Sequence, residues 1–280
     1  VEHDIDSIYK IVRKIKGCIV WGGGVNLAPS DDQIIRLERP LSIDAPSQLL
    51  ASVIAKKASV SSSHLLVDIP FGKNSKCPTK KNAVNLSNNF IKLAHKFGIK
   101  TEVMLSDGSH PIGNGIGPAL EAIDIMKVLH NDPDAPRGVR TKALYMAGLL
   151  FELTKKAKRG EGIRLALKTL ISGKALKKMN EIIDAQGRKV KDYTKIKVGK
   201  YRHDVLSDKR GKVNEINNIL ISRLARLAGA PDDYGAGVYL HKHVNDKIVK
   251  GEKIFTIYAD SLVNLKEAKA FAEESKLYVY

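Results

Sequence analysis

Two apolar segments separated by a long helical segment constrain the fold of this chain most. His64–Ile69 is predominantly apolar, and Pro70 and Gly72 end it. A helix is predicted from about Ala83 to Phe97, and a second strand from Thr101 to Leu105. Successive parallel strands need a crossover connection, which a helix usually supplies. This order therefore predicts an α/β fold with a parallel pair of strands.

The segments on either side of this unit differ in pattern. Helices are expected to dominate from the second strand up to about Asp184, and short alternating strands from about Val190. This change predicts a second, β-rich domain. The other expected elements are helices over 5–15, 44–59 and 263–274, and strands over 18–21, 238–241 and 254–258.

Size and composition indicate an ordinary globular protein. The chain has 280 residues, 43% of them hydrophobic, which suggests two lobes with buried cores. No apolar run approaches the ~20 residues that span a bilayer, and the first residues are too acidic for a signal peptide. Cys18 and Cys77 lie far apart and outside any metal-binding spacing. We expect a cytoplasmic protein with reduced thiols and no membrane partner.

The positive charge is concentrated in one stretch. Residues 151–212 hold 19 Lys and Arg against 7 Asp and Glu, which is +12 of the net +17. A nucleic-acid groove would combine such charge with aromatic side chains, but this stretch has chiefly Tyr193 and Tyr201. Much of the charge alternates with Leu and Ile at helical spacing. We interpret it as a solvated face and expect no nucleic-acid partner.

Three polar residues around the predicted helix 44–59 form a candidate site. Ser52 and Lys56 are four residues apart, so they lie on one helical face. A hydroxyl and an ammonium group there could hold the carbonyls and ring nitrogen of a heterocycle. Asp44 at the head of the helix could give or take a proton. The alternative is a helix cap with two surface residues.

Other candidates carry weaker signals. Lys73 and Lys76 follow the end of a strand, where ligands bind in open α/β sheets, although solvated lysines would look the same. Glycines in 22–24 and 113–117 could approach a phosphate or only form tight turns. His241 and His243 are expected on one side of a strand without a third metal ligand, which favours a structural role.

Five segments resemble segments of the thymidine phosphorylase and AMP phosphorylase family. Residues 21–32 resemble its Gly-Gly-x-x-Asn-Leu-Ala-Pro-Ala-Asp-Asp segment, and 50–57 its Ala-Ser-Ile-Leu-Ala-Lys-Lys helix. Residues 67–73 are similar to its Asp-Val-Lys-x-Gly or Asp-Ile-Pro-x-Gly strand. Residues 113–121 resemble its Gly-x-x-x-Gly-x-Ala-Leu-Glu segment, and 185–187 its Ala-Gln-Gly. The resemblance thus covers nearly the whole chain.

The resemblance implies an α/β fold with a helical lobe and a mixed-sheet α/β lobe that close on a cleft, followed by a C-terminal α+β domain. We expect residues 1–29 to begin the α/β lobe and 30–60 to form the helical-lobe segment. Residues 61–188 would complete the α/β lobe, and 189–280 would form the C-terminal domain.

The resemblance also implies roles for four residues. Ser52 and Lys56 correspond by position to residues that hold the pyrimidine ring. In the AMP phosphorylase branch, Asp44 falls on the proton donor, and Ser52 and Lys76 fall on nucleotide contacts. The resemblance therefore assigns Asp44 and Lys56 to catalysis, and Ser52 and Lys76 to substrate binding.

The base-binding arginine of the family has no exact counterpart. Thymidine phosphorylases have Arg-Asp-x-Thr-Ala-Thr before the helix, whereas residues 37–42 read Leu-Glu-Arg-Pro-Leu-Ser. The nearest arginines, Arg36 and Arg39, are the substrate-binding candidates. The sequence of residues 37–42 is closer to the AMP phosphorylase branch, so the base specificity stays open.

Two departures from the family shape the expectation. Its Lys-His/Arg-Ser phosphate loop and Ser-Arg-Ala-Ile-Thr-Ser-like segment do not occur here, and the family keeps both upstream of Val1. We therefore expect a C-terminal fragment that folds but is inactive alone. Residues 237–258 also resemble the hammerhead of a lipoyl or biotin carrier, but a tripeptide with a central lysine flanked on both sides by Asp or Met does not occur there. A carrier is the distant alternative.

The resemblance implies a pentosyltransferase of nucleoside salvage that uses inorganic phosphate as co-substrate and no cofactor or metal. A thymidine phosphorylase of the AMP-phosphorylase-like type is the first interpretation. AMP phosphorylase is the alternative. A homodimer or higher homo-oligomer is expected.

Overall fold

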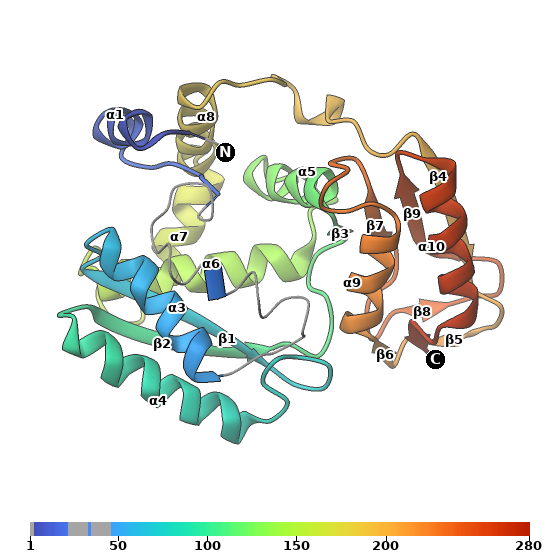
Figure 1. Ribbon diagram of the computed structural model, residues 1–280, viewed down its shortest axis with the longest axis horizontal. Coiled ribbons are helices and arrows are strands. Elements are labelled where there is room, and N and C mark those ends of the chain that lie inside the picture. Colours follow the sequence, from blue (N-terminus) through green and yellow to red (C-terminus); the bar gives the residue numbers. More distant parts are fainter. Residues whose placement is uncertain (1–2, 22–32, 35–45) are drawn as a thin grey trace. The chain divides into compact units, whose positions relative to one another are not determined.

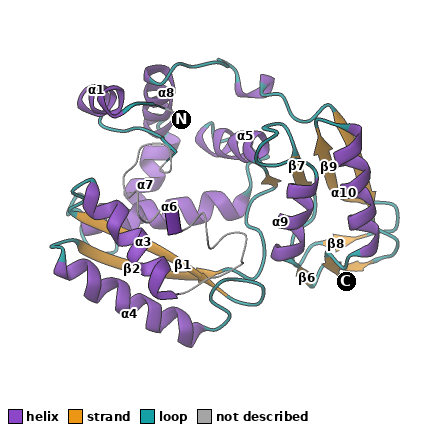
Figure 2. Cartoon of the chain, viewed as in Figure 1, coloured by secondary structure: helices purple, strands orange, loops and turns teal. Residues whose placement is uncertain are grey.

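The computed structural model describes residues 3–21, 33–34 and 46–280 (Figure 1). The chain forms two compact units, and each combines helices with β-strands (Figure 2). Unit 1 comprises residues 1–70, 79–106 and 144–189, and unit 2 comprises 71–78, 107–143 and 190–280. The expected mixed α/β class is confirmed at this level.

Unit 1 contains the strand–helix–strand segment predicted from the sequence. Its elements are β1 (His64–Phe71), α4 (Lys80–Lys96) and β2 (Lys100–Asp107). The carbonyl of Ser63 accepts from the N–H of Lys100 at 3.0 Å, and that of Phe71 from the N–H of Gly108 at 2.8 Å. The sequence offset is the same at both ends, so the two strands run in the same direction. The expected parallel pairing is confirmed.

Helix α4 forms where the sequence places a cap and an apolar stripe. The Thr79 hydroxyl accepts from the backbone N–H of Asn82 at 3.2 Å, which satisfies one donor of the first turn. Four residues at helical spacing are buried on one face of the helix: Ala83, Leu86, Phe90 and Ala94. This face anchors α4 in the core of unit 1.

Further helices complete unit 1. They are α1 (Ile5–Ile15), α3 (Pro46–Ser59), α6 (Arg137–Leu153, which begins in unit 2), α7 (Gly162–Ile171) and α8 (Lys174–Ala185). The last three of them lie in the region between the second strand and about Asp184 that was predicted to be mainly helical. Helix α3 packs on α4, and α8 packs on both α7 and α1.

The strand expected over residues 18–21 is wrong. The backbone N–H and carbonyl of Ile19 bond to the side-chain amide of Gln186, at 2.7 and 2.6 Å. The side chains of Ile19 and Trp21 are 46% and 58% exposed. Since a side chain satisfies the polar backbone groups and the apolar side chains stay in solvent, nothing here requires a buried strand.

Unit 2 is built around a four-stranded antiparallel sheet in the order β3-β7-β9-β4. These strands are β3 (Gly115–Ile116), β7 (Gly237–Leu240), β9 (Lys253–Ala259) and β4 (Tyr201–Leu206). Two small sheets pair β5 (Gly211–Lys212) with β8 (Lys247–Ile248), and β6 (Glu215–Ile216) with β10 (Tyr278–Val279). The β-rich region predicted from about Val190 is therefore present.

Helices cover this sheet and close the core of unit 2. They are α5 (Pro118–Leu129), α9 (Asn218–Leu227) and α10 (Leu262–Glu274), and the short 3₁₀ helix η2 (Tyr193–Lys195) packs on α5. Strand β9 is buried along most of its length, and α9 and α10 pack against the sheet. The side chains of Ile216, Leu224, Val238 and Ile257 are 0% exposed. This apolar core holds the C-terminal third of the chain together.

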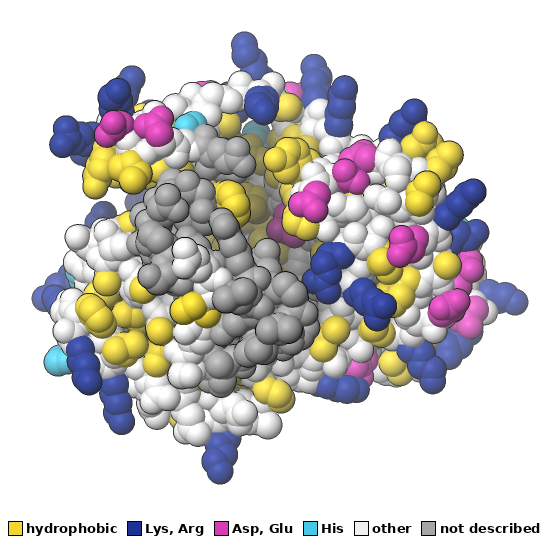
Figure 3. Space-filling view, viewed as in Figure 1, with side chains coloured by type: hydrophobic (Ala, Val, Ile, Leu, Met, Phe, Trp, Pro, Cys, Tyr) yellow, Lys and Arg dark blue, Asp and Glu magenta, His cyan; other side chains and the backbone are white. Residues whose placement is uncertain are grey.

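The basic stretch lies mainly on exposed positions. Lys168, Lys174 and Lys177 on α7 and α8 are exposed. On the face drawn in Figure 3, Lys and Arg side chains are interspersed with uncharged and hydrophobic ones. Among the described residues, no helix is long and apolar enough to cross a membrane.

Candidate functional site

Ser52 and Lys56 lie on helix α3, as the sequence predicts. Both side chains are half-buried, and Ile54 between them is 1% exposed, so it anchors the helix. The spacing of four residues puts Ser52 and Lys56 one turn apart on the same side. Two hydrogen-bond donors thus line one half-buried helical face, which is suited to a ligand with several acceptors.

The remaining residues of this candidate site lie outside the described residues. Asp44, Arg36 and Arg39 fall in 35–45, and Gly22–Gly24 fall in 22–32. Their predicted roles therefore stay predictions. The two donors on α3 are the part of the site that the structure describes in unit 1.

Lys76 belongs to a closed turn between β1 and α4. The N–H of Gly72 donates to the carbonyl of Cys77 at 2.9 Å, and that of Ser75 to the carbonyl of Gly72 at 3.1 Å. The Ser75 hydroxyl lies 2.8 Å from the carbonyl oxygen of Gly72 and 2.7 Å from that of Cys77. Cys77 is buried, whereas Lys76 and Lys73 are exposed. The turn therefore carries its lysines on a backbone tied at both ends.

An acidic side chain that the sequence interpretation did not select lies near the carboxyl ends of the parallel strands. The hydroxyl of Ser106 on β2 donates to Oδ1 of Asp68 on β1 at 2.6 Å. Both belong to unit 1. Polar residues near the ends of neighbouring parallel strands are the signal that could have identified the pair.

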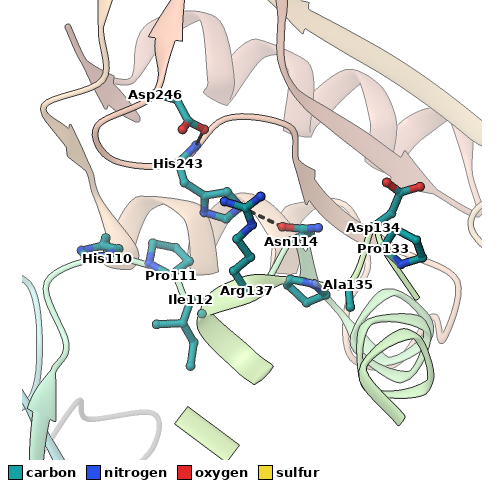
Figure 4. A pocket seen from close by; sticks show the side chains of 12 residues that line it. His110, Pro111, Ile112, Asn114, Pro133, Asp134, Ala135, Arg137, His243 and Asp246 are labelled. Carbon is teal, nitrogen blue, oxygen red and sulfur yellow. Dashed lines mark hydrogen bonds between the residues drawn. The ribbon is translucent and has the colours of Figure 1, made fainter. Parts of the chain in front are cut away.

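Unit 2 contains a cavity of 440 Å³ beside the N-terminus of α6 (Figure 4). Its polar lining comes from the segment before β3, the start of α6 and the loop after β7. The polar lining residues are His110, Asn114, Asp134, Arg137, His243 and Asp246. Prolines 111, 133 and 136 form part of the wall. The cavity could accept a small polar ligand.

His243 and Asn114 are held in this cavity by hydrogen bonds. Nε2 of His243 lies 2.8 Å from Oδ1 of Asn114, and Figure 4 shows the two side chains pointing toward each other. The backbone N–H of His243 donates to Oδ2 of Asp246 at 2.7 Å. Burial lowers the pKa of His243, which favours the neutral ring near pH 7. The Asn114 amide in turn donates to the Tyr239 hydroxyl at 3.2 Å.

The expected arrangement of His241 and His243 on one strand is wrong. Strand β7 ends at Leu240, so both residues lie beyond it. His241 Nε2 lies 2.8 Å from the Thr256 hydroxyl, whereas His243 faces Asn114. Over residues 3–21, 33–34 and 46–280, no group of three His, Cys, Asp or Glu side chains could hold a metal ion.

The glycines at 113–117 are used in packing. A Cβ on Gly115 would lie 2.5 Å from the backbone of Leu120, and one on Gly117 would lie 2.3 Å from the carbonyl oxygen of Ala236. Asp124 Oδ2 accepts from the N–H groups of Asn114 and Gly115 at 2.7 and 2.8 Å. These contacts support a packing role for Gly115 and Gly117. Asp124 is a second carboxylate that sequence reasoning missed.

Asp124 is 3% exposed, and burial raises the pKa of its carboxyl group. Its Oδ1 has no hydrogen-bond partner among the residues that the structure describes. The carboxyl group therefore fixes the backbone before β3 at an electrostatic cost.

Comparison with known proteins identifies the family. Residues 212–277 match the pyrimidine nucleoside phosphorylase C-terminal domain. The chain is 41% identical over 278 residues to a candidate thymidine phosphorylase from Albidiferax ferrireducens, which covers 99% of this chain and 53% of that protein. It is 42% identical over 276 residues to an AMP phosphorylase from Methanosarcina barkeri, which covers 98% of this chain and 54% of that protein. The chain belongs to the thymidine and AMP phosphorylase family.

The similarity extends to AMP phosphorylase from Methanococcus maripaludis, at 43% identity over 268 residues, 96% of this chain and 53% of that protein. The resemblance inferred from the sequence motifs is confirmed. The chain spans about half the length of the curated relatives it matches.

Proposed function

We propose that the enzyme containing this chain cleaves the N-glycosidic bond of a nucleoside with inorganic phosphate. The products are the free base and ribose or deoxyribose 1-phosphate. The observation that carries this proposal is the similarity of nearly the whole chain to thymidine and AMP phosphorylases, at 41–42% identity. The two donors Ser52 and Lys56 on one face of α3 support it.

The chemistry requires stabilisation of a departing base. Phosphate forms a bond to the anomeric carbon, the C–N bond breaks, and its electron pair leaves with the base. Ser52 and Lys56 would donate hydrogen bonds to the base, where negative charge grows as the bond breaks. Asp44 would supply a proton to the leaving base. Arg36 or Arg39 would contact the base as a further donor.

Thymidine is the first proposed substrate, in the AMP-phosphorylase-like type of thymidine phosphorylase. AMP is the alternative, in which case the products would be adenine and ribose 1,5-bisphosphate. The amino-acid sequence of residues 37–42 favours the AMP alternative. In that case Lys76 would contact the nucleotide. A lysine suits the phosphate of a nucleotide because its ammonium group is a compact point charge.

Phosphorolysis assays of the enzyme test this proposal. Thymidine, uridine, AMP and CMP are each incubated with inorganic phosphate, and the released base is measured. Release from thymidine alone supports the first substrate, and release from AMP supports the alternative. If no base is released from any of the four, the proposed function is wrong.

Several finer features belong to the same proposal. The C-terminal α+β domain, residues 189–280, would have a hammerhead-like arrangement. Residues 30–60 would belong to the helical lobe, and 1–29 and 61–188 to the α/β lobe. The enzyme would work in the cytoplasm as a homodimer or higher homo-oligomer. It would need no cofactor, because phosphorolysis transfers a glycosyl group without electron transfer.

A further inference from the structure

Glu215 joins the C-terminal region to the turn that carries Lys76. The ammonium Nζ of Lys73 lies 2.6 Å from Oε2 of Glu215, and the amide of Asn74 donates to Oε1 at 3.3 Å. All of these residues belong to unit 2. One carboxylate therefore binds the side chains of two successive residues in the turn.

The backbone of Glu215 is itself well anchored. Glu215 pairs with Val279 in the small sheet of β6 and β10, and the neighbouring Asn214 donates its N–H to the carbonyl of Val279 at 2.7 Å. Ile216 is 0% exposed and belongs to the core of unit 2. Since both neighbours are fixed, the carboxylate is presented from a rigid support.

The carboxylate side chain has the burial and charge state that this contact needs. The Glu215 side chain is 28% exposed, whereas that of Lys73 is 70% exposed. The hydrogen bond from Lys73 lowers the pKa of Glu215, so the carboxyl group is ionised at neutral pH. Asn74 has a φ of +63°, a left-handed conformation that costs energy in a non-glycine residue. Its side-chain hydrogen bond to Glu215 helps to hold it.

We propose that Glu215 is a positioning residue, which orders the Gly72–Cys77 turn so that Lys76 is held ready for the nucleotide. The role of Lys76 rests on the AMP alternative of the proposed function, whereas the clamp that Glu215 forms with Lys73 and Asn74 rests on the observed contacts. Glu215 lies within 212–277, the part that matches the phosphorylase C-terminal domain, and the turn lies outside it. The C-terminal domain would thus support substrate binding without touching the substrate.

The clamp is tested first without any substrate. The enzyme that contains this chain is digested with limiting trypsin, and cleavage after Lys76 is followed by mass spectrometry. Glu215→Gln removes the charge and keeps the shape, and should speed this cleavage about two- to fivefold, as loss of one exposed ion pair would. Glu215→Asp should restore part of the protection. Unchanged cleavage in Glu215→Gln would overturn the proposal.

Two further variants separate the clamp from general unfolding. Glu252→Gln removes another ion pair of unit 2, that of Glu252 with Lys242 at 2.5 Å, and should leave cleavage after Lys76 unchanged. Lys73→Met breaks the same clamp from the turn side and should match Glu215→Gln. If Glu252→Gln speeds the cleavage equally, the effect is not local and the proposal fails.

The positioning role is tested in the enzyme that contains this chain. Glu215→Gln should raise KM for the nucleotide about threefold while kcat stays near the parent value, because an ordered turn reduces the entropy lost on binding. An unchanged KM beside faster cleavage would overturn the positioning role. If the parent releases base from thymidine but not from AMP, the positioning role of Glu215 toward Lys76 fails. If it shows no phosphorolysis at all, the proposed function fails. In both cases the trypsin experiment still decides whether the clamp exists.

Discussion

At the residue scale, Lys56 carries the most specific prediction. Lys56→Met in the enzyme removes a donor to the departing base, so turnover should fall about a hundred- to a thousandfold, or roughly 2.7–4 kcal/mol, with a smaller change in KM. Steady-state kinetics measures both. Lys57→Met is the matched control, since Lys57 is the exposed neighbour on the same helix. Equal effects of the two substitutions would exclude a direct role for Lys56.

Asp124 gives a prediction about pH. Burial raises its pKa above the ordinary value of 3.8, so the folded state favours the protonated carboxyl group. The stability that this group contributes is therefore present below about 3.8 and is lost as pH rises through the raised folded pKa. The variant Asp124→Asn has no ionisable side chain at this position. Denaturant unfolding should show the parent losing stability relative to this variant as pH rises from about 4 to 7.

The control for this prediction is a carboxylate with the opposite shift. Hydrogen bonds from Thr194 lower the pKa of Asp192. Asp192→Asn should therefore not reproduce the relative gain seen for Asp124→Asn over the same pH range. If the parent instead gained stability relative to Asp124→Asn as the pH rises, the pKa of the buried Asp124 carboxyl group would not be raised.

At the element scale, Gly117 lets helix α5 begin close to strand β7. Its φ is +132°, and an added Cβ would lie 2.3 Å from the carbonyl oxygen of Ala236. Gly117→Ala should therefore destabilise the protein by about 2 kcal/mol or more. Urea unfolding measures this loss.

Gly251 is the matched control for backbone strain alone. Its φ is also positive, at +81°, but no atom lies within 4 Å of an added Cβ. Gly251→Ala should cost only about 1 kcal/mol, from the left-handed conformation. If the two variants lose equal stability, the close approach at Gly117 is not what requires glycine.

Secondary structure in this chain followed local pattern where an apolar stripe was present. Helix α1 spans Ile5–Ile15 as expected, and α4 and α10 begin within a few residues of their predicted starts. The strand predicted over residues 18–21 was wrong because a short apolar run does not reveal whether a partner strand exists. The loop histidines at 241 and 243 were misplaced because β7 ends one residue earlier than expected.

At the scale of the whole molecule, the charge of +17 predicts only weak, salt-sensitive contact with nucleic acid. The exposed lysines of α7 and α8 lie among apolar and acidic residues, including Glu181, which pairs with Lys178. Fluorescence anisotropy with duplex DNA should show binding at low salt that disappears at about 150 mM. Micromolar binding that persists at this salt concentration would revive a nucleic-acid function.

The sequence by itself determined the family, the α/β class and the strand–helix–strand unit. It also determined that Ser52 and Lys56 lie on one helical face. These follow from motifs and from periodicities within about twenty residues. Only the tertiary structure decided that β3 pairs with β7, and that Glu215 reaches Lys73 and Asn74. These contacts join residues more than a hundred positions apart. Local patterns do not encode them, because they depend on how buried surfaces pack around a shared core.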